Sequence, residues 1–242
     1  MYSVENLTVM GHEMPVLVFE PEGAGPHPGL IVAQHLPVAH AGLELDPFQI
    51  KVGERYAAAG YKVAMPFLFH WWPPETDIAV KREAFRDDWT VADLRETFNW
   101  LAAQAAVRSD AIGLLGHCWG GRITWLGACS LPSLGAAALF YGGRVKQQFA
   151  DGAPAPVTLA TQIKCPVLGV FGNEDASPSP EDVNDYEAAL KEAGVDYTFH
   201  RFDEAGHGFQ DFTNTERYRE RQSEEAWSIA LTFLDRTLNA SA

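Results

Sequence analysis

The 242-residue sequence is poor in three features that would assign it to particular classes of protein. Its three cysteines are an odd number without zinc-ligand spacing, which disfavours both a disulfide scaffold and a structural metal site. Lys and Arg total 18 against 32 Asp and Glu, and this net charge of −14 disfavours nucleic acid and anionic membranes as partners. No apolar run approaches the roughly 20 residues that cross a bilayer.

The remaining composition is that of an ordinary globular protein, with 47% hydrophobic and 21% charged residues. The first residues do not combine a basic start with an apolar segment, so we expect no signal peptide and a cytoplasmic location. The length suits a single α/β domain over residues 1–242, as a monomer or a small homo-oligomer.

Apolar runs typical of strands alternate with segments of helical spacing along the chain. This alternation forces crossover connections, so we expect an α/β fold with a mainly parallel, twisted sheet of about 7–8 strands and helices on both faces. The expected strands are a hairpin over 7–21, then 29–34, 61–65, 111–115, 134–141, 165–171 and 197–202. The expected helices are 47–59, 78–104, 180–193 and 216–238, besides one directly after residue 120.

The segment Gly116-His117-Cys118-Trp119-Gly120 ends an apolar run and fits the spacing G-x-(Ser/Cys)-x-G. This is typical of a nucleophile elbow, in which a buried strand turns sharply into a helix and small flanking residues make room for the turn. The turn exposes the thiol of Cys118 at the positive end of the helix, where a thiolate is favoured. The alternative is that Cys118 is a small buried residue in a Gly-rich turn.

An acid and a histidine follow the elbow in the chain order of α/β-hydrolases. Asp175 follows a predicted buried strand, and His207 lies between two glycines after the next one. A cysteine nucleophile needs a base and the base needs an anionic partner, so we predict a triad of Cys118, Asp175 and His207. The alternatives are a capping or solvated turn residue for Asp175, with Glu174 as its rival, and an exposed loop residue for His207.

Attack on a carbonyl also requires two N–H donors for the oxyanion. We expect one from Trp119, at the start of the helix, and the other from Leu36, because Pro37 beside it has no N–H. The other two cysteines, Cys129 and Cys165, are expected in the core, and His117 is expected to be structural.

With these residues in hand, the chain resembles the dienelactone hydrolase family, the carboxymethylenebutenolidases. The resemblance covers nearly the whole length and rests on the motifs 34–36, 116–121, 140–142, 172–175 and 205–209. Cysteine in place of serine at the elbow is the most specific of them. The resemblance implies an α/β-hydrolase fold, hydrolysis of an ester or lactone through an acyl-cysteine, and no cofactor.

The sequence departs from the family at two positions. Members that cleave dienelactone carry a glutamate that takes part in thiol activation where this chain has His35, and a carboxylate-binding arginine where it has Asp211. A second carboxylate-binding arginine corresponds to Arg82, through an alignment with a gap. An aspartate would repel a carboxylate, so we expect a substrate other than dienelactone itself.

His35 has two interpretations: a second imidazole that stabilises the thiolate or binds substrate, or a neutral side chain that hydrogen-bonds the loop backbone. A metal site built on His35, His40 and His70 is disfavoured because no carboxylate stands at a ligand spacing. Aromatic residues are candidates for the pocket lining, and the segment 71–74 is the best candidate for a lid. The pocket candidates are Trp72, Trp89, Tyr141 and Phe209, with Phe67, Phe69, Trp71 and Trp119 as further ones.

The sequence therefore predicts a cysteine hydrolase acting on a small, aromatic or apolar ester or lactone. Two other functions stay open. One is a thioesterase or acyltransferase, which the same triad would support. The other is a catalytically silent ligand-binding protein with a hydrolase fold.

Overall fold

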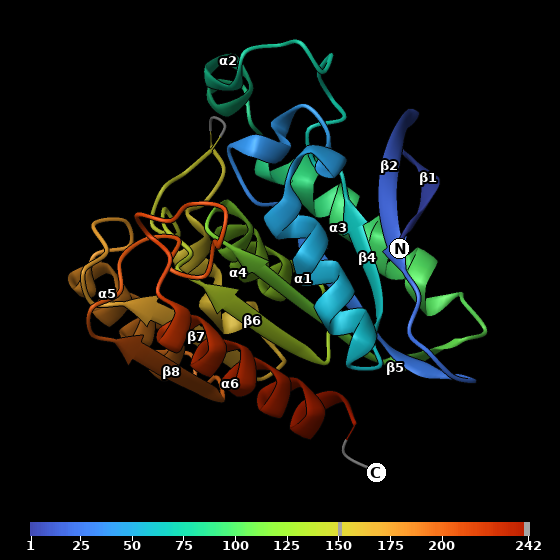
Figure 1. The fold of residues 1–242 in the computed structure, drawn as a ribbon. Coiled ribbons are helices and arrows are strands. Elements are labelled where there is room, and N and C mark those ends of the chain that lie inside the picture. Colours follow the sequence, from blue (N-terminus) through green and yellow to red (C-terminus); the bar gives the residue numbers. More distant parts are fainter. Residues whose placement is uncertain (150–151, 240–242) are drawn as a thin grey trace.

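The computed structural model describes residues 1–149 and 152–239, and the strands of these residues join one sheet in the order β1-β2-β4-β3-β5-β6-β7-β8 (Figure 1). The strands are β1 (Ser3–Val9), β2 (His12–Phe19), β3 (His27–Ala33), β4 (Lys62–Pro66), β5 (Val107–His117), β6 (Ala136–Phe140), β7 (Val167–Gly172) and β8 (Tyr197–Phe202). The α-helices are α1 (Pro47–Ala58), α2 (Ile78–Glu83), α3 (Asp87–Ala102), α4 (Trp119–Ser130), α5 (Pro180–Glu192) and α6 (Glu220–Leu238). Three 3-10 helices cover Val38–His40, Leu43–Leu45 and Pro156–Gln162.

Only β2 runs against the other strands. β1 pairs with β2 and β2 pairs with β4 in antiparallel register, whereas β4, β3, β5, β6, β7 and β8 are parallel. Helices α1 and α6 cover one face of the sheet, and α3, α4 and α5 lie on the other (Figure 1). The predicted α/β fold, with a mainly parallel sheet between two layers of helices, is confirmed.

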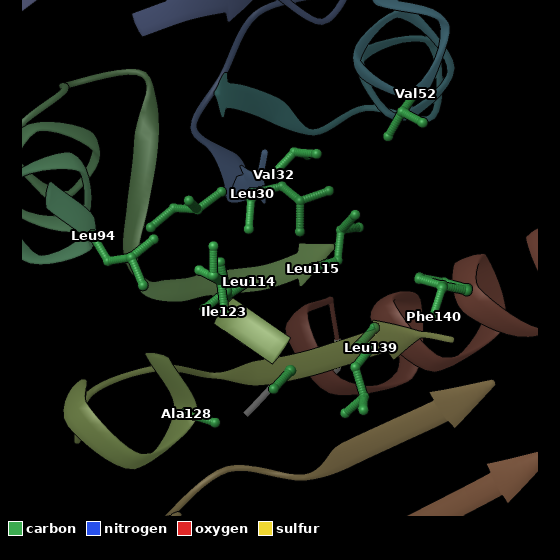
Figure 2. Close-up of a cluster of buried hydrophobic side chains, with 14 of the residues drawn as sticks. Leu30, Val32, Val52, Leu94, Leu114, Leu115, Ile123, Ala128, Leu139 and Phe140 are labelled. Carbon is green, nitrogen blue, oxygen red and sulfur yellow. The ribbon is translucent and has the colours of Figure 1, made fainter. Parts of the chain in front are cut away.

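The core lies on both faces of the central strands, where parallel pairing buries every side chain. Successive residues of β5 point to opposite faces: Leu114 packs toward Leu94 of α3 and Ile123 of α4, and Leu115 points toward Val52 of α1 (Figure 2). All five side chains are fully buried. Burial of a Leu or Ile side chain contributes about 1.5–3 kcal/mol, so this continuous apolar block holds the carboxyl ends of the strands in place.

The predicted long helix over 78–104 is wrong, because the chain forms two helices there. Phe85, in the connection, is 2% exposed and packs edge-on against Trp119, with 4.9 Å between ring centroids. Arg86 is extended, and a new helix begins at Asp87. Inward burial of one aromatic side chain thus interrupts a helical pattern that is continuous in the sequence. None of the helices in the described part of the chain combines the length and the apolar character needed to cross a membrane.

Candidate active site

Cys118 lies on the sharp turn between β5 and α4. Its backbone has φ 55° and ψ −116°, a conformation that costs energy for a non-glycine residue. The flanking glycines make this turn possible. A Cβ atom on Gly116 would collide with the backbone of Gly120, and one on Gly120 would lie 2.5 Å from the Ala33 carbonyl oxygen. The local sequence therefore produces a strained elbow that presents its central side chain at the carboxyl edge of the sheet.

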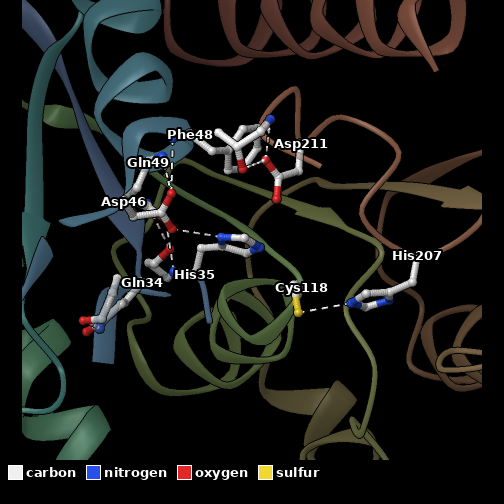
Figure 3. Close-up of polar contacts among 11 residues, drawn as sticks. Gln34, His35, Asp46, Phe48, Gln49, Cys118, His207 and Asp211 are labelled. Carbon is white, nitrogen blue, oxygen red and sulfur yellow. Dashed lines mark hydrogen bonds and ion pairs between the residues drawn. The ribbon is translucent and has the colours of Figure 1, made fainter. Parts of the chain in front are cut away.

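The three residues of the predicted triad meet at this edge. His207, in the loop after β8, places Nε2 3.0 Å from the Cys118 Sγ (Figure 3). Its Nδ1 lies 2.9 Å from Oδ2 of Asp175, in the loop after β7. The other carboxylate oxygen of Asp175 accepts the Ser177 backbone N–H at 2.8 Å. A carboxylate at Nδ1 favours the tautomer with a proton there, which leaves Nε2 free to exchange a proton with sulfur.

The electrostatics of the site favour an ionised thiol. Burial alone would raise the pKa of Cys118, but the hydrogen bond and charge of His207, with a further contribution from His35, bring it below the ordinary value. Burial likewise opposes protonation of His207, and contact with Asp175 and Cys118 outweighs it and raises the pKa of that imidazole. The resting pair is therefore favoured as thiolate and imidazolium.

The two expected oxyanion donors, Leu36 and Trp119, belong to residues of the same cavity lining as Cys118. Trp119 is the first residue of α4, so its N–H has no partner within the helix. Leu36 follows β3, and both residues line the cavity above Cys118. The loop that carries Leu36 is braced, because the His35 N–H donates to Oε1 of the Gln49 side chain at 2.9 Å. This arrangement provides two backbone amides on a rigid support near the sulfur.

A cavity of about 670 Å³ opens over the thiol, large enough for a small ester or lactone. Its lining combines residues from the elbow, from the loops after β3, β6, β7 and β8, and from α2. The lining residues are Leu36, Pro37, Arg82, Cys118, Trp119, Gly143, Arg144, Glu174, Asp175, Ala176, Ser177, Gly206, His207, Glu216, Arg217 and Arg219.

Four arginines stand in this lining although the chain is strongly acidic. Arg219 is occupied, because its guanidinium donates to the backbone carbonyls of Glu204, Glu216 and Tyr218. The guanidinium groups of Arg82, Arg144 and Arg217 have no acceptor among residues 1–149 and 152–239. The cavity therefore offers cationic groups that are available to a ligand.

His35 forms a buried pair with Asp46, the residue that precedes α1 (Figure 3). Its Nδ1 lies 2.9 Å from Oδ2 of the carboxylate, and the two side chains are 8% and 2% exposed. The ring lies between Asp46 and Cys118. Of the two interpretations of His35, the structure therefore favours an imidazole that faces the thiol, and a carboxylate rather than the loop backbone is its side-chain partner.

Among the aromatic candidates, Trp119 belongs to the cavity lining, and Phe67, Phe69, Trp71, Trp72, Trp89, Tyr141 and Phe209 do not. Trp72 and Trp89 pack against each other with ring centroids 5.8 Å apart. Tyr141 is fully buried with its ring 5.4 Å from that of His207, and Phe209 packs 5.4 Å from the Tyr141 ring on the far side. Trp72, Tyr141 and Phe209 pack in or against the core, and none of these four side chains lines the space above the sulfur.

The segment proposed as a lid is tied to α3. Trp71 donates from Nε1 to Oδ2 of Asp93 at 3.1 Å, and His70 contacts the other carboxylate oxygen at 2.9 Å. His35 and His70 thus each have a carboxylate partner of their own, and no cluster of three potential metal ligands occurs in the described part of the chain. The structure gives no support for a lid at 71–74.

His117 was predicted to be structural and Cys129 and Cys165 to lie in the core, and all three side chains are buried. His117 is fully buried and stacks on Phe140 at 4.4 Å between ring centroids. Cys129 and Cys165 are both buried. Burial also raises the pKa of each of these two thiols to about 12, so neither is reactive at neutral pH.

Sequence reasoning missed Asp46 and three of the arginines. Asp46 precedes a proline at the start of a helix, which indicates a capping residue, but nothing in the sequence pairs it with His35. Arg217 and Arg219 fall inside the predicted terminal helix over 216–238, whereas α6 begins at Glu220. Arg144 lies beyond β6 in a segment without periodicity. No local pattern signals that these loops meet.

The order of the strands, the elbow after β5 and the loops that supply an acid and a histidine define an α/β-hydrolase fold. Residues 14–238 match the dienelactone hydrolase family, and the chain belongs to that family, whose members are ester and lactone hydrolases.

Relatives agree with this assignment over most of their length. A "putative carboxymethylenebutenolidase" from Yersinia pestis is 29% identical over 91% of this chain and 83% of its own. A crystal structure of a "putative dienelactone hydrolase" from Klebsiella pneumoniae superposes with a TM-score of 0.84 and 28% identity, covering 98% and 99% of the two chains. A "probable 2-oxo-3-(5-oxofuran-2-ylidene)propanoate lactonase" from a Bradyrhizobium species is 27% identical over 65% of this chain and 63% of its own.

Proposed function

We propose that the protein hydrolyses a small carboxylic ester or lactone through an acyl-thioester on Cys118. The observation that supports this proposal most directly is the continuous line of contacts from Sγ through His207 to Asp175, at 3.0 and 2.9 Å. It combines a nucleophile, a base and an orienting carboxylate within reach of one another.

In the acylation step, the thiolate attacks the carbonyl carbon and forms a C–S bond while the carbonyl π electrons move to oxygen. The amides of Leu36 and Trp119 stabilise that oxyanion. When the intermediate collapses, the C–O bond to the leaving group breaks, and His207 donates its Nε2 proton to the departing alkoxide. In a lactone the alkoxide stays attached, so ring opening releases no fragment.

In the deacylation step, neutral His207 accepts a proton from a water molecule whose oxygen attacks the thioester carbonyl. The second intermediate expels the Cys118 thiolate and releases the carboxylic acid, and the imidazolium and thiolate are restored. Asp175 remains ionised throughout, and it orients and stabilises the imidazolium. No oxidant, reductant or metal ion enters either step.

We further propose that the substrate carries an anionic group away from the reacting carbonyl. Arg82, in α2, and Arg144, in the loop after β6, both line the cavity, and because neither guanidinium has an acceptor among the described residues, both can bind a carboxylate. Asp211, which we expected to repel such a group, is absent from the lining, and its carboxylate accepts the backbone N–H of Thr213 at 2.9 Å. A relative that is named as a lactonase of a propanoate is consistent with this chemistry.

The test of the nucleophile is turnover of p-nitrophenyl acetate and dihydrocoumarin, with intact-mass measurement of the protein. Wild type is expected to turn over both, and Cys118→Ala to lose turnover and form no adduct. Undiminished turnover in Cys118→Ala would overturn the proposal. A stalled acyl adduct on the wild type would favour an acyltransferase, and neither turnover nor adduct on any ester or lactone would favour a binding protein.

The test of the anionic group is a comparison of two arginine variants. Arg82→Gln is expected to raise KM for an ester with a remote carboxylate by about tenfold or more and to leave KM for a neutral ester unchanged. Arg86→Gln is the matched control, because Arg86 pairs with Asp88 and lies outside the cavity lining. Equal KM changes in both variants would contradict the assignment of Arg82.

A further inference from the structure

The thiol of Cys118 stands between two imidazoles, each with its own aspartate. His207 and Asp175 approach from the loops after β8 and β7, and His35 and Asp46 approach from the opposite side (Figure 3). The mechanism above uses only the first pair. The pair of His35 and Asp46 is nearly as buried as the protein core, with side chains 8% and 2% exposed. Solvent therefore does not screen the charges of this pair.

The two carboxylate oxygens of Asp46 make different contacts. Oδ1 accepts the backbone N–H groups of Phe48 and Gln49, at 3.0 and 3.2 Å, and so caps the first turn of α1. Oδ2 contacts Nδ1 of His35 at 2.9 Å. Helix capping holds the carboxylate in one orientation, with Oδ2 directed at the His35 ring. The imidazole therefore faces a fixed negative charge.

The other groups around His35 decide whether its ring carries a charge. The Phe48 ring packs edge-on at 5.2 Å from the imidazole and excludes water from that side. The charged or titratable neighbours are Asp46, Cys118, Asp211 and His117. Burial lowers the pKa of His35, but Asp46, Cys118 and Asp211 outweigh it and raise the pKa above the ordinary value. His117 is buried and its own pKa is lowered well below the usual range, so it stays neutral and does not compete.

We propose that the Asp46–His35 pair is a fixed cationic partner of Cys118, which keeps the sulfur ionised in the free enzyme and stabilises it as the leaving group of deacylation. This inference rests on the proposed function of Cys118 as nucleophile. His35 is a positioning and electrostatic residue in this scheme, and it exchanges no proton with the substrate. His207 remains the group that transfers protons.

The positive charge on His35 has its largest effect in the free enzyme and in the deacylation step. In the free enzyme the thiolate lies between two imidazolium groups, so it is expected to be nucleophilic before any substrate enters. In deacylation the C–S bond breaks and its electron pair returns to sulfur, while His207 has taken the proton of the attacking water. His35 then remains as a cation beside the departing thiolate.

The test is the pH dependence of Cys118 alkylation by iodoacetamide in the free enzyme, followed by intact mass. Asp46→Asn is the main variant, since asparagine keeps an oxygen for the helix cap and removes the charge. We expect the thiol pKa to rise by about one unit or more in this variant. At a pH below the wild-type value, the alkylation rate would then fall about tenfold or more. His35→Gln is expected to give a shift of the same sign.

Glu44→Gln is the matched control, because it removes the same charge from an exposed side chain two residues before Asp46 in the sequence. It is expected to alkylate with the wild-type pH profile. A wild-type profile in both Asp46→Asn and His35→Gln would overturn the inference. If those variants do not fold, ¹⁵N-histidine NMR of the wild type decides: a doubly protonated His35 ring at pH 7 supports the inference, and a neutral ring overturns it.

These results are separable from the failure of the proposed function. The alkylation profile is measured without substrate, so it reports the ionisation of the thiol whether or not the thiol is the nucleophile. If Asp46→Asn shifts the profile but Cys118→Ala retains turnover, the electrostatic pairing holds and the catalytic assignment falls. If the profile is unchanged and Cys118→Ala loses turnover, the triad holds and the role of His35 falls.

Discussion

Removal of the carboxylate at Asp87 is expected to cost a large part of the stability of the fold. Asp87 begins α3 and forms a bidentate pair with Arg122 of α4, at 2.6 and 2.9 Å. The Arg122 side chain is fully buried and that of Asp87 is 7% exposed. The guanidinium also donates to the carbonyl oxygens of Arg144 and Gln147, at 3.1 and 3.0 Å, so it holds the loop beside the cavity.

Asp87→Asn keeps the shape of the side chain and one acceptor oxygen, but it leaves the cation of Arg122 without a counter-charge. Breaking a buried pair in this way costs about 3–5 kcal/mol, and we expect the lower end, about 3 kcal/mol, because one hydrogen bond survives. For a chain of this size each kcal/mol lowers the melting temperature by about 2–4 °C, so the expected loss is about 6–12 °C.

Asp88→Asn provides the matched control at the next position. Asp88 also pairs with an arginine, Arg86 at 2.8 Å, but the two side chains are 60% and 46% exposed. Exposed pairs contribute about 0–1 kcal/mol, so this variant should unfold close to wild type. Urea unfolding followed by circular dichroism measures the free energy of unfolding of both variants. Equal losses in the two variants would refute the argument that burial decides the contribution of the pair.

Three further predictions concern the site. Asp175→Asn should lower kcat/KM for p-nitrophenyl acetate by up to about 10⁴-fold, because an amide favours the wrong tautomer of His207, and an unchanged value would contradict its role. Gly120→Ala should lower the free energy of unfolding in urea by about 1–3 kcal/mol, because the added Cβ would lie 2.5 Å from the Ala33 carbonyl oxygen. The control Gly60→Ala has open space around its Cβ and should show only the cost of its positive φ. The pKa of Cys118 is lowered, so the alkylation rate should be near its maximum already at a pH below the ordinary thiol pKa of about 8.5 and should fall on acidification. A midpoint of the pH profile at or above that value would contradict a resting thiolate.

The parts of the site that were predictable from the sequence depend on local constraints. The elbow was predictable from its glycine spacing because its sharp turn requires small residues: a Cβ on Gly116 would collide with the backbone of Gly120. Asp175 and His207 were predictable because each follows a strand, and the carboxyl ends of parallel strands meet at one edge. The alternation of strands and helices likewise gave the class of fold.

The parts that were not predictable depend on contacts between segments distant in sequence. The break at Phe85 occurs because an aromatic ring 34 residues away, on Trp119, offers it a buried contact, and the helical spacing of 78–104 carries no trace of it. Asp46 has the local signature of a helix cap, which conceals its second contact with His35. The aromatic residues Trp72 and Trp89 were predicted in the cavity from their type alone, and type does not distinguish a lining residue from a supporting one.

The free arginines at the cavity give the molecule an uneven electric field. With a net charge of −14, the protein as a whole repels anions, whereas the cavity lining holds four arginines against the three carboxylates of Glu174, Asp175 and Glu216 and attracts anions locally. Screening confines each effect to about 8 Å at physiological ionic strength, so a small anion that diffuses to the opening meets mainly the local attraction. A polyanion that spans a wider stretch of the surface meets the repulsion as well. The surface therefore acts as a filter by size and charge together, and the abundant nucleic acids of a cell would not compete for the opening.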